Sequence, residues 1–320
     1  MNNILGLLSD GQFHSGEELG LALGISRASI WKGLKKLEAE HGIEVFRVPG
    51  KGYRLAERLD LLDQSRLEAF LGRQGWRVHV AEHLDSTNAE ALRLLQRGVP
   101  PPFIVISEYQ VNGRGRRGRQ WVSPAYKNLY YSLAWSVPNG SAGLAGLSLV
   151  AGLAVLETLT RCGVARVGLK WPNDIYAEDK KIAGILLELI GDPADVCSVV
   201  IGVGINVNMV GQALEIAQPC ISLRDVVNRV FDRNELSCLL SESLERYLRK
   251  HALSGFASMR EEWESNHLWQ GKACVLSSGV VEVKGRVLGV DDQGALRLDV
   301  DGVEKRFSGG ELSLRLGNDS

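Results

Sequence analysis

The spacing of hydrophobic positions in the first 60 residues changes from helical to strand-like. Apolar residues recur every three or four positions after Ser15, whose hydroxyl can cap a helix, and Gly24 ends this run. A second run with the same spacing begins at Ser26. Residues 45–55 then alternate between apolar and polar around a Pro-Gly-Lys-Gly sequence, which is typical of a β-hairpin. Two helices, a glycine turn between them and a hairpin after them predict a winged helix-turn-helix.

The middle of the chain, from residue 63 to about 268, alternates strand-like and helix-like runs. Strands are expected at 103–107, 129–135, 167–171, 182–189 and 199–203, and helices at 89–96, 142–161 and 234–250. This alternation predicts a central α+β domain with a mixed sheet, and its length of roughly 200 residues is normal for a domain.

The last 50 residues contain short alternating segments separated by glycine and aspartate turns. The segments cover residues 273–277, 280–290, 295–300 and 304–307. Short strands joined by tight turns predict a small β-barrel of the SH3-like type. We therefore expect three domains: a winged helix-turn-helix over 1–62, a central α+β domain over 63–268, and a β-barrel over 269–320.

Composition and charge exclude several classes of protein. Of the 320 residues, 45% are hydrophobic and 23% charged, and 37 basic and 38 acidic side chains give a net charge of −1. These are globular values, and the balanced charge argues against a uniformly basic nucleic-acid coat. The five cysteines are scattered, and no zinc-ligand spacing is present, so neither a disulfide framework nor a metal site is expected. No signal-peptide or membrane-span pattern is found, which predicts a cytoplasmic protein without a membrane partner.

Positive charge is concentrated in the predicted second helix and hairpin. Residues 25–37 hold four basic side chains and no acid, and residues 45–54 hold three and no acid. Neutralisation of phosphates by such side chains provides most of the affinity of DNA-binding winged modules. The candidate DNA-binding residues are Ser26, Arg27, Ser29, Lys32 and Lys51. The alternative is a solvated helical face in a module that binds another protein.

A loop rich in glycine and arginine follows the strand expected at 103–107. Gly113, Gly115 and Gly118 formally match GxGxxG, but residues 119–124 are a poor helix start, so a dinucleotide-binding turn is not expected. Three glycines and the four arginines within residues 114–119 can bring backbone N–H groups and guanidinium groups to a phosphate or carboxylate. The loop therefore favours an anion-binding role over a flexible surface loop or an RNA contact.

Several other short stretches place polar side chains at the ends of expected elements. Residues 85–88 (Asp-Ser-Thr-Asn) precede a helix, residues 170–174 (Lys-Trp-Pro-Asn-Asp) end one strand and begin another, and Lys181 begins an apolar strand. Residues 202–208 combine glycines with two asparagines. Taken singly, these are also the patterns of a helix cap, a solvated turn lysine and a strand bulge.

In this order, these stretches resemble the family of bifunctional biotin–protein ligases and biotin operon repressors of bacteria. The resemblance covers essentially the whole chain. It depends on residues 16–17, 26–28 and 48–53 of the winged module, on 85–88, 113–119, 170–174, 181–186 and 204–206 of the central domain, and on 309–313 near the end.

The resemblance implies an enzyme with two half-reactions and a second role in transcription. A biotin carboxylate attacks the α-phosphate of MgATP to give biotinyl-5′-AMP and pyrophosphate, and a lysine of the biotin carboxyl carrier protein of acetyl-CoA carboxylase then attacks the mixed anhydride. ATP and Mg²⁺ are the implied cofactors and biotin is the substrate. The winged module is expected to bind operator DNA of biotin synthesis genes as a homodimer, with biotinyl-5′-AMP as corepressor.

The resemblance also implies roles for individual residues. The implied catalytic residues are Arg114, Arg116, Asp174 and Lys181. The residues implied to bind biotin or the adenylate are Ser86, Thr87, Asn88, Gln110, Gly113, Arg114, Gly115, Arg116, Lys170, Trp171, Asn173, Lys181, Gly184 and Asn206.

One stretch departs from the family, and two other functions stay open. Residues 209–220 share little with the family pattern and contain no aromatic residue, so the resemblance does not say how the adenine is covered. The main alternative is a DNA-binding regulator that senses an adenylate without turnover, which would show no biotin-dependent exchange between pyrophosphate and ATP. A lipoate ligase is disfavoured, because the winged module and the basic loop fit it poorly.

Overall fold

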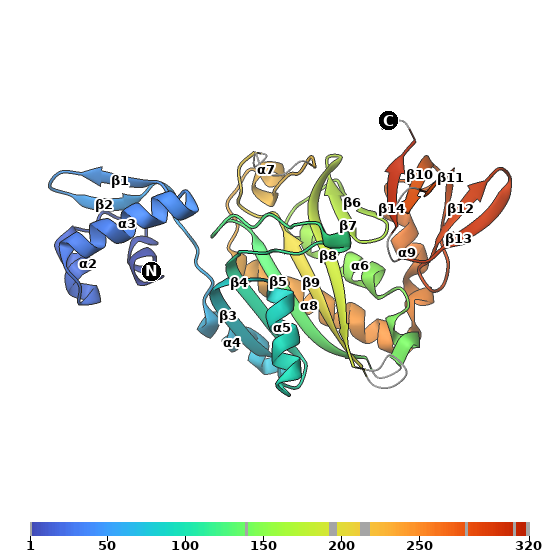
Figure 1. Cartoon of the computed structure of the whole chain (residues 1–320), viewed down its shortest axis with the longest axis horizontal. Coiled ribbons are helices and arrows are strands. Elements are labelled where there is room, and N and C mark those ends of the chain that lie inside the picture. Colours follow the sequence, from blue (N-terminus) through green and yellow to red (C-terminus); the bar gives the residue numbers. More distant parts are fainter. Residues whose placement is uncertain are drawn as a thin grey trace.

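Three parts follow one another along the longest axis of the molecule (Figure 1). The structure, a computed structural model, describes residues 2–137, 140–191, 197–211, 218–278, 281–309 and 312–317. A small helical unit with a hairpin lies at one end, a large sheet covered by helices lies in the middle, and a small sheet lies at the other end. The α+β class and the order of the three parts agree with the prediction from the sequence.

The N-terminal unit is a winged helix-turn-helix, as its hydrophobic spacing predicts. Its elements are α1 (Asn2–Leu8), α2 (Gly16–Leu23), α3 (Arg27–His41), β1 (Val45–Val48) and β2 (Gly52–Leu55). Ser15 and Glu18 form a capping box at α2, and Gly24 ends this helix with a positive φ of 65° that favours glycine. Ser26 caps α3 by accepting a hydrogen bond from the Ser29 amide. The apolar faces of the three helices pack into one core, which also includes Ala125 and Tyr126 of the central domain.

The central domain contains a seven-stranded mixed sheet with the order β3-β4-β5-β9-β8-β7-β6. Only β3 and β4 are parallel. The strands are β3 (Arg77–Leu84), β4 (Phe103–Gln110), β5 (Leu129–Val137), β6 (Val167–Lys170), β7 (Asp174–Ala177), β8 (Lys180–Ile190) and β9 (Cys197–Ile205). The helices are α4 (Gln64–Leu71), α5 (Thr87–Gln96), α6 (Leu147–Arg161), α7 (Leu223–Val227), α8 (Arg233–Ser254) and α9 (Arg260–Ser265).

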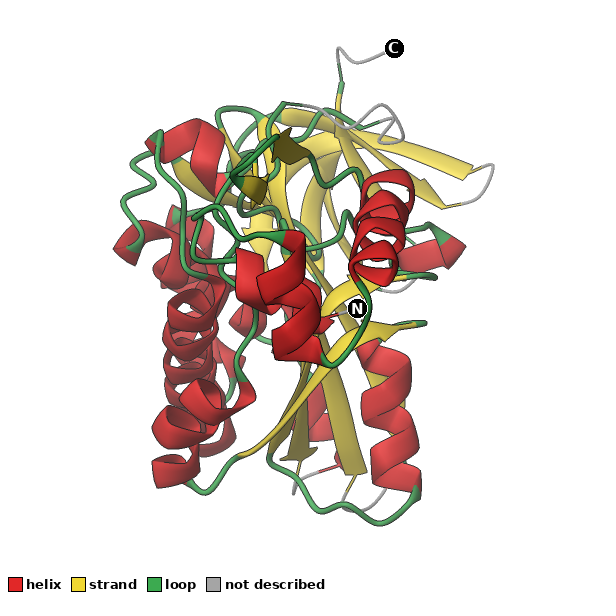
Figure 2. Cartoon of the chain, turned by 90° about the vertical axis from the view of Figure 1, so that its left-hand side faces the viewer, coloured by secondary structure: helices red, strands yellow, loops and turns green. Residues whose placement is uncertain are grey.

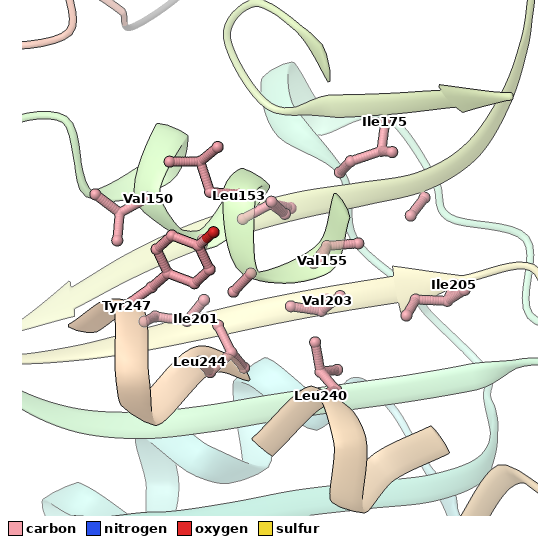
Figure 3. Packing of buried hydrophobic residues seen from close by; sticks show 14 of the residues in the cluster. Val150, Leu153, Val155, Ile175, Ile201, Val203, Ile205, Leu240, Leu244 and Tyr247 are labelled. Carbon is pink, nitrogen blue, oxygen red and sulfur yellow. The ribbon is translucent and has the colours of Figure 1, made fainter. Parts of the chain in front are cut away.

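Helices cover both faces of this sheet (Figure 2). Figure 3 shows the larger core, where Ile201, Val203 and Ile205 of β9 meet apolar side chains of α6 and α8. Because side chains alternate along a strand, Gly202 and Gly204 face the opposite side of the sheet. Their side of the sheet is the one that α5 partly covers, since α5 packs with Phe103 and Val200 in a smaller cluster. The sheet thus has one fully covered face and one face with room for a site.

A buried ion pair holds the linker between the winged module and the central domain. Arg233 and Glu108 are 1% and 4% exposed, and their charged atoms lie 2.6 Å apart. Glu108 accepts a hydrogen bond from the Leu62 amide, and Arg233 donates one to the Asp60 carbonyl oxygen. Because removing one partner would leave a buried charge without compensation, this pair fixes the linker strongly.

The C-terminal part is a five-stranded antiparallel sheet with the order β13-β12-β11-β10-β14. Its strands are β10 (Ala273–Ser278), β11 (Val281–Val290), β12 (Leu296–Val300), β13 (Val303–Phe307) and β14 (Ser313–Leu316). Over residues 273–317, as far as they are described, no pairing joins β13 to β14, so the β-rich domain is confirmed but the closed barrel is not observed. Residues 310–311 of the predicted last motif lie outside the described residues.

Some elements differ from the expectations or were not expected. The helix predicted over 142–161 begins only at Leu147, because Gly146 has a φ of 68°, and a short 3₁₀ turn covers residues 140–144. Helices α1 and α4 and strand β3 were not predicted. No helix in the described part of the chain is both long enough and apolar enough to cross a membrane.

Candidate active site

A pocket of about 950 Å³ opens on the face of the central sheet that α5 covers only in part. Three glycines on neighbouring strands form its floor, since Gly184 pairs with Gly204 and Leu186 pairs with Gly202. A Cβ at Gly202 would collide with the Asn88 amide, and one at Gly204 would collide with the indole of Trp121. The floor therefore requires glycine, because other side chains pack directly on the backbone there.

One end of the pocket is lined by neutral, buried polar groups at the start of α5. Ser86, Thr87 and Asn88 are only 2–4% exposed. Gln110 accepts hydrogen bonds from the Thr87 amide (2.8 Å) and hydroxyl (3.2 Å). The Ser132 hydroxyl lies 2.8 Å from the Thr87 hydroxyl and 2.6 Å from Asn88 Oδ1. This end can bind a compact neutral group through fixed donors and acceptors.

Asp85, which precedes these residues, contacts Arg93 of α5 and does not line the pocket. Arg93 donates two hydrogen bonds to its carboxylate, and this contact lowers the pKa of Asp85 to about 2. Asp85 is absent from the residues that line the pocket. Of the four polar residues 85–88, the last three belong to the site and the first stabilises α5.

The other end of the pocket is charged. Lys181 Nζ lies 2.6 Å from Asp174 Oδ1, and both side chains are about one-fifth exposed, at 19% and 17%. The same ammonium lies 5.4 Å from the centroid of the Trp121 ring. Arg116 donates a hydrogen bond to Asn173 Oδ1 at 2.9 Å, and burial lowers the pKa of Arg116. Two fixed cations beside a carboxylate and an amide suit an anionic group whose charge grows during a reaction.

The glycine- and arginine-rich loop folds back on itself and spans the pocket. The Gly115 amide donates to the Arg119 carbonyl oxygen at 2.7 Å, and the Trp121 amide donates to the Gly113 carbonyl oxygen at 2.9 Å. At the tip, Arg117 has a φ of 61°. The tip holds Arg116, whose guanidinium also donates to the Leu312 carbonyl oxygen of the C-terminal domain at 3.5 Å. The loop thus connects β4 with the far wall of the pocket.

That far wall comes from the β6–β7 turn and the C-terminal domain. Lys170 lies 4.6 Å from the centroid of the Trp269 ring and 3.2 Å from the Tyr176 hydroxyl. Burial lowers the pKa of Lys170. Gln218 donates to the same tyrosine hydroxyl at 2.6 Å, so the chain lies at the pocket again from residue 218 onward. Residues 212–217 of the segment 209–220 are outside the described part of the chain.

All but one of the residues that the sequence assigned to biotin or the adenylate line this pocket. The exception is Gly113, which lies just behind it against Gln110 and Trp121. Asn206 lines the pocket, but its amide donates to the Ile221 and Lys181 carbonyl oxygens. Trp171 is 1% exposed, and its indole donates to the Gly294 carbonyl oxygen of the C-terminal domain.

The sequence did not assign several residues that shape the site. Trp121 covers the glycine floor, Ser132 joins Thr87 to Asn88, and Glu188 accepts a hydrogen bond from Asn88. Trp121 had a usable signal, since it is the aromatic residue that directly follows the loop. Ser132 and Glu188 lie inside ordinary strand sequences that carry no local signal.

The donors in the pocket limit how it could hold Mg²⁺. No group of three or more His, Cys, Asp or Glu side chains that could hold a metal ion is found within the described residues. Asp174 and Asp179 are the carboxylates that line the pocket. Since Mg²⁺ is commonly held by one or two carboxylates together with substrate phosphates, these residues fit an ion that arrives with a nucleotide.

The candidate DNA-binding residues lie together on the exposed side of α3 and on the wing. Ser26 and Ser29 are joined by a hydroxyl contact of 2.9 Å at the start of α3. Lys32 and Lys51 are exposed. Arg27 packs its aliphatic part near Gly16 and Tyr53, at the contact between α2 and the wing. This surface presents exposed cations to a large partner.

Comparisons with known protein families agree with this architecture part by part. The family described as "Biotin/lipoate A/B protein ligase family" matches residues 80–206. An "HTH domain" family matches residues 1–54, and the "Biotin protein ligase C terminal domain" matches residues 271–315.

Similar individual proteins cover almost the whole chain. The "Bifunctional ligase/repressor BirA" of Escherichia coli is 41% identical over 98% of this chain and 96% of its own length. The protein of the same name from Bacillus subtilis is 32% identical over 93% of both chains. Among solved structures, the biotin protein ligase of Aquifex aeolicus in complex with biotin and ATP has a TM-score of 0.67 and 30% identity, covering 75% of this chain and 99% of that chain.

Proposed function

The chain belongs to the BirA family of bifunctional biotin–protein ligases and repressors, and from this membership we propose how its residues divide the two functions. The protein activates biotin with ATP and transfers it to a lysine of a carrier protein, and it represses biotin synthesis genes through its winged module. The observation that carries the enzymatic assignment is the pocket, which combines a neutral buried end with a charged end under the arginine-containing loop.

In the first half-reaction an oxygen of the biotin carboxylate attacks the α-phosphate of ATP. A bond from oxygen to phosphorus forms, the bond to the bridging oxygen breaks, and pyrophosphate leaves. Two anions must approach each other, so the enzyme has to offset their repulsion. Lys181 and Arg116 are placed for this at the charged end, with Asn173 and Asp174 holding them in position.

The neutral end of the pocket is proposed to hold the ureido ring of biotin. Thr87, Asn88 and Gln110 offer donors and acceptors there, and Ser132 holds Thr87 and Asn88 through its hydroxyl. Trp121 adds an apolar surface to the pocket. A ureido group is neutral, planar and rich in hydrogen-bonding atoms, so it matches fixed polar groups without any charge to compensate.

In the second half-reaction a lysine amine of the carrier protein attacks the carbonyl carbon of the mixed anhydride. An amide bond forms, AMP leaves and the amine loses a proton. Asp174 is the pocket carboxylate that contacts Lys181, and we propose that it orients this amine. Mg²⁺ would be held through the phosphates with Asp174, and it would supply further neutralisation of the phosphate charge.

The repressor function is assigned to the winged module and to a dimer of the whole chain. Operator contacts are proposed for Ser26, Arg27, Ser29, Lys32 and Lys51. Two half-sites require two copies of the module, and we propose that the dimer forms when biotinyl-5′-AMP is bound.

The free edge of β8 supports a surface for this dimer. Within the described residues, β8 pairs with β7 only up to Gly184 and pairs with β9 as far as Ile190. Leu189 on this edge is 48% exposed. An unpaired strand edge with an exposed apolar residue can pair with the same edge of a second copy. We further propose that the protein acts in the cytoplasm and that its domains cover residues 1–62, 63–268 and 269–320.

Incubation with biotin, MgATP and a biotin carboxyl carrier protein domain, read by a streptavidin blot, tests the enzymatic function. Biotinylation of the carrier lysine is the expected result. A regulator that only senses an adenylate would give no blot signal and no biotin-dependent exchange of labelled pyrophosphate into ATP, and that outcome would replace the ligase assignment.

A further inference from the structure

A continuous row of polar contacts connects the neutral end of the pocket with the first arginine of the loop. It runs from Gln110 through Thr87, Ser132 and Asn88 to a glutamate, Glu188 of β8. The two ends of this row are close in sequence. Gln110 is the last residue of β4, and Arg114, which contacts Glu188, follows four positions later in the loop.

Glu188 occupies the last position of this row with one oxygen on each side. Its Oε2 accepts a hydrogen bond from Asn88 Nδ2 at 2.8 Å, and its Oε1 lies 3.5 Å from Nη1 of Arg114. Asn88 also donates to the Leu186 carbonyl oxygen, so the orientation of its amide is fixed and Nδ2 faces the carboxylate. The Glu188 side chain is 26% exposed, so it is half-buried beside Asn88 and Arg114, two residues that line the pocket.

Arg114 depends on this glutamate for its direction. The contact with Glu188 is the one ion pair of the Arg114 side chain among the described residues, and that side chain is 49% exposed. A half-exposed guanidinium without a partner would sample many rotamers, since arginine has high side-chain entropy. Arg116, two positions later, is instead held by Asn173.

We propose that Glu188 is a positioning residue that holds Arg114 at the mouth of the pocket, ready for the anionic part of the ligand. Its carboxylate restricts the guanidinium, and Asn88 fixes the carboxylate from the other side. The arrangement ties the entrance of the loop to the buried row that begins at Gln110. This inference rests on the proposed ligase function and adds a residue that the family motifs in the sequence did not indicate.

The test uses Glu188→Gln, because glutamine keeps an oxygen that Asn88 can reach but removes the charge that attracts Arg114. We expect kcat/KM for biotin in pyrophosphate exchange to fall about threefold to fivefold, since exposed ion pairs are weak. The loss should come mainly from a higher KM with little change in kcat. Combined with Arg114→Gln, the substitution should have no further effect. Glu282→Gln, an exposed strand glutamate of the C-terminal sheet, is the matched control.

A second measurement does not depend on catalysis. Trypsin cleavage after Arg114 in the ligand-free protein, followed by mass spectrometry, should be about threefold faster in Glu188→Gln than in the wild-type protein, with cleavage after Arg119 unchanged. If wild-type protein shows no ligase activity, the proposed function fails and this measurement alone decides the inference. Three results would overturn the role of Glu188. They are equal cleavage rates after Arg114 in the variant and the wild-type protein, an equal effect of Glu188→Gln on kcat/KM with and without Arg114, and a rise in kcat/KM.

Discussion

Two basic regions of this chain are assigned to phosphate groups, and their cations are arranged in opposite ways. In the pocket the important cations are half-buried and have partners, as Lys181 has Asp174 and Arg116 has Asn173. On the winged module, the candidate DNA-binding residues Lys32 and Lys51 are exposed and have no ion pair among the described residues. Other cations of the module, Lys35, Lys36 and Arg47, pair with acidic side chains of α3. The same charge is therefore held in two environments that differ in solvent access.

Solvent access decides what each region can recognise. A partly desolvated cation with a fixed partner acts at one place and strongly, because little water screens it and it needs no reorganisation when an anion arrives. An exposed, unpaired cation acts weakly by itself, but each one that meets a DNA phosphate releases counterions. The pocket is thus suited to a discrete reacting anion, and the winged module to a long polyanion.

The largest effect that would test this contrast is expected at Lys181. Lys181→Ala removes the cation that we propose to stabilise charge between the carboxylate and the α-phosphate, and such losses cost about 3 kcal/mol, or roughly a hundredfold in rate. Lys180→Ala is the matched control, because Lys180 precedes it on β8 and is exposed. Pyrophosphate exchange measures both. A Lys181 variant within a few-fold of the wild-type rate would remove this residue from the mechanism.

The next effect is expected on the winged module and should depend on salt. Lys51→Ala or Arg27→Ala should weaken operator binding and reduce the slope of log K against log salt by about one for each DNA phosphate that the variant no longer neutralises. Ligase activity should stay at the wild-type level. Mobility shifts at several salt concentrations provide the measurement.

Arg47 offers an internal contrast within the wing. It forms an ion pair with Glu38 of α3, and this contact raises the pKa of Arg47. Since its charge is already compensated, Arg47→Ala should change the salt slope less than Lys51→Ala does. Equal slopes for the two variants would mean that internal pairing does not separate DNA-binding cations from structural ones.

Local sequence was enough to predict the parts of this molecule that depend on local chemistry. Ser15, Ser26 and Gly24 mark the ends of helices, and they predicted the two helices of the winged module. Residues 86–88, the loop at 113–119 and Lys181 predicted the pocket because each stands at the end of an element, where side chains from different elements meet.

Contacts between distant segments could not be predicted in this way. Glu188 and Arg114 are 74 positions apart, and their contact exists only because β8 and the loop meet over Asn88. The buried pair of Arg233 and Glu108 likewise depends on the start of α8 lying close to the end of β4. The start of α6 was wrong because Gly146 interrupts an otherwise apolar run that hydrophobic spacing alone extends to residue 142.

A smaller effect, on the free energy of unfolding, is expected at His267, which lies between α9 and the first strand of the C-terminal sheet. His267 is buried, stacks on Trp263 at 4.7 Å, and neither ring nitrogen has a hydrogen-bond partner among the described residues. Burial lowers the pKa of His267 from 6.5 to about 4. The unfolded chain therefore binds a proton at this histidine below about pH 6.5, whereas the folded protein binds it only below about pH 4. The free energy of unfolding thus falls as the pH falls from 6.5 to 4.

The size of this effect can be measured with His267→Phe. At pH 5 the wild-type protein should have lost about 2 kcal/mol through this group, from about 1.5 pH units at 1.36 kcal/mol each. The phenylalanine keeps the stacking on Trp263 and removes the titration. Denaturant unfolding at pH 7 and pH 5 should show a shallower pH dependence in the variant. Identical slopes would mean that His267 does not titrate on unfolding.

The smallest effect is expected at the joint, by which we mean the contact of α3 of the winged module with Tyr109 and Tyr126 of the central domain. The ring of His41, the last residue of α3, lies 4.8 Å from Tyr109 of β4 and 5.8 Å from Tyr126. Burial lowers the pKa of His41, against a smaller opposing effect of Glu40 and Glu82. The neutral ring is the form that packs, so this packing stabilises the joint above pH 6.5 and weakens as the pH falls below it.

His41→Phe should keep the aromatic contact and remove its pH dependence, whereas His41→Ala should loosen the joint at every pH. Proteolysis of the linker at residues 56–63, compared at pH 7.5 and pH 5.5, reports the joint directly. We expect faster cleavage at the lower pH in the wild-type protein and no such change in His41→Phe. A pH effect of equal size in both would mean that a group other than His41 causes the pH dependence, and it would remove His41 from this role.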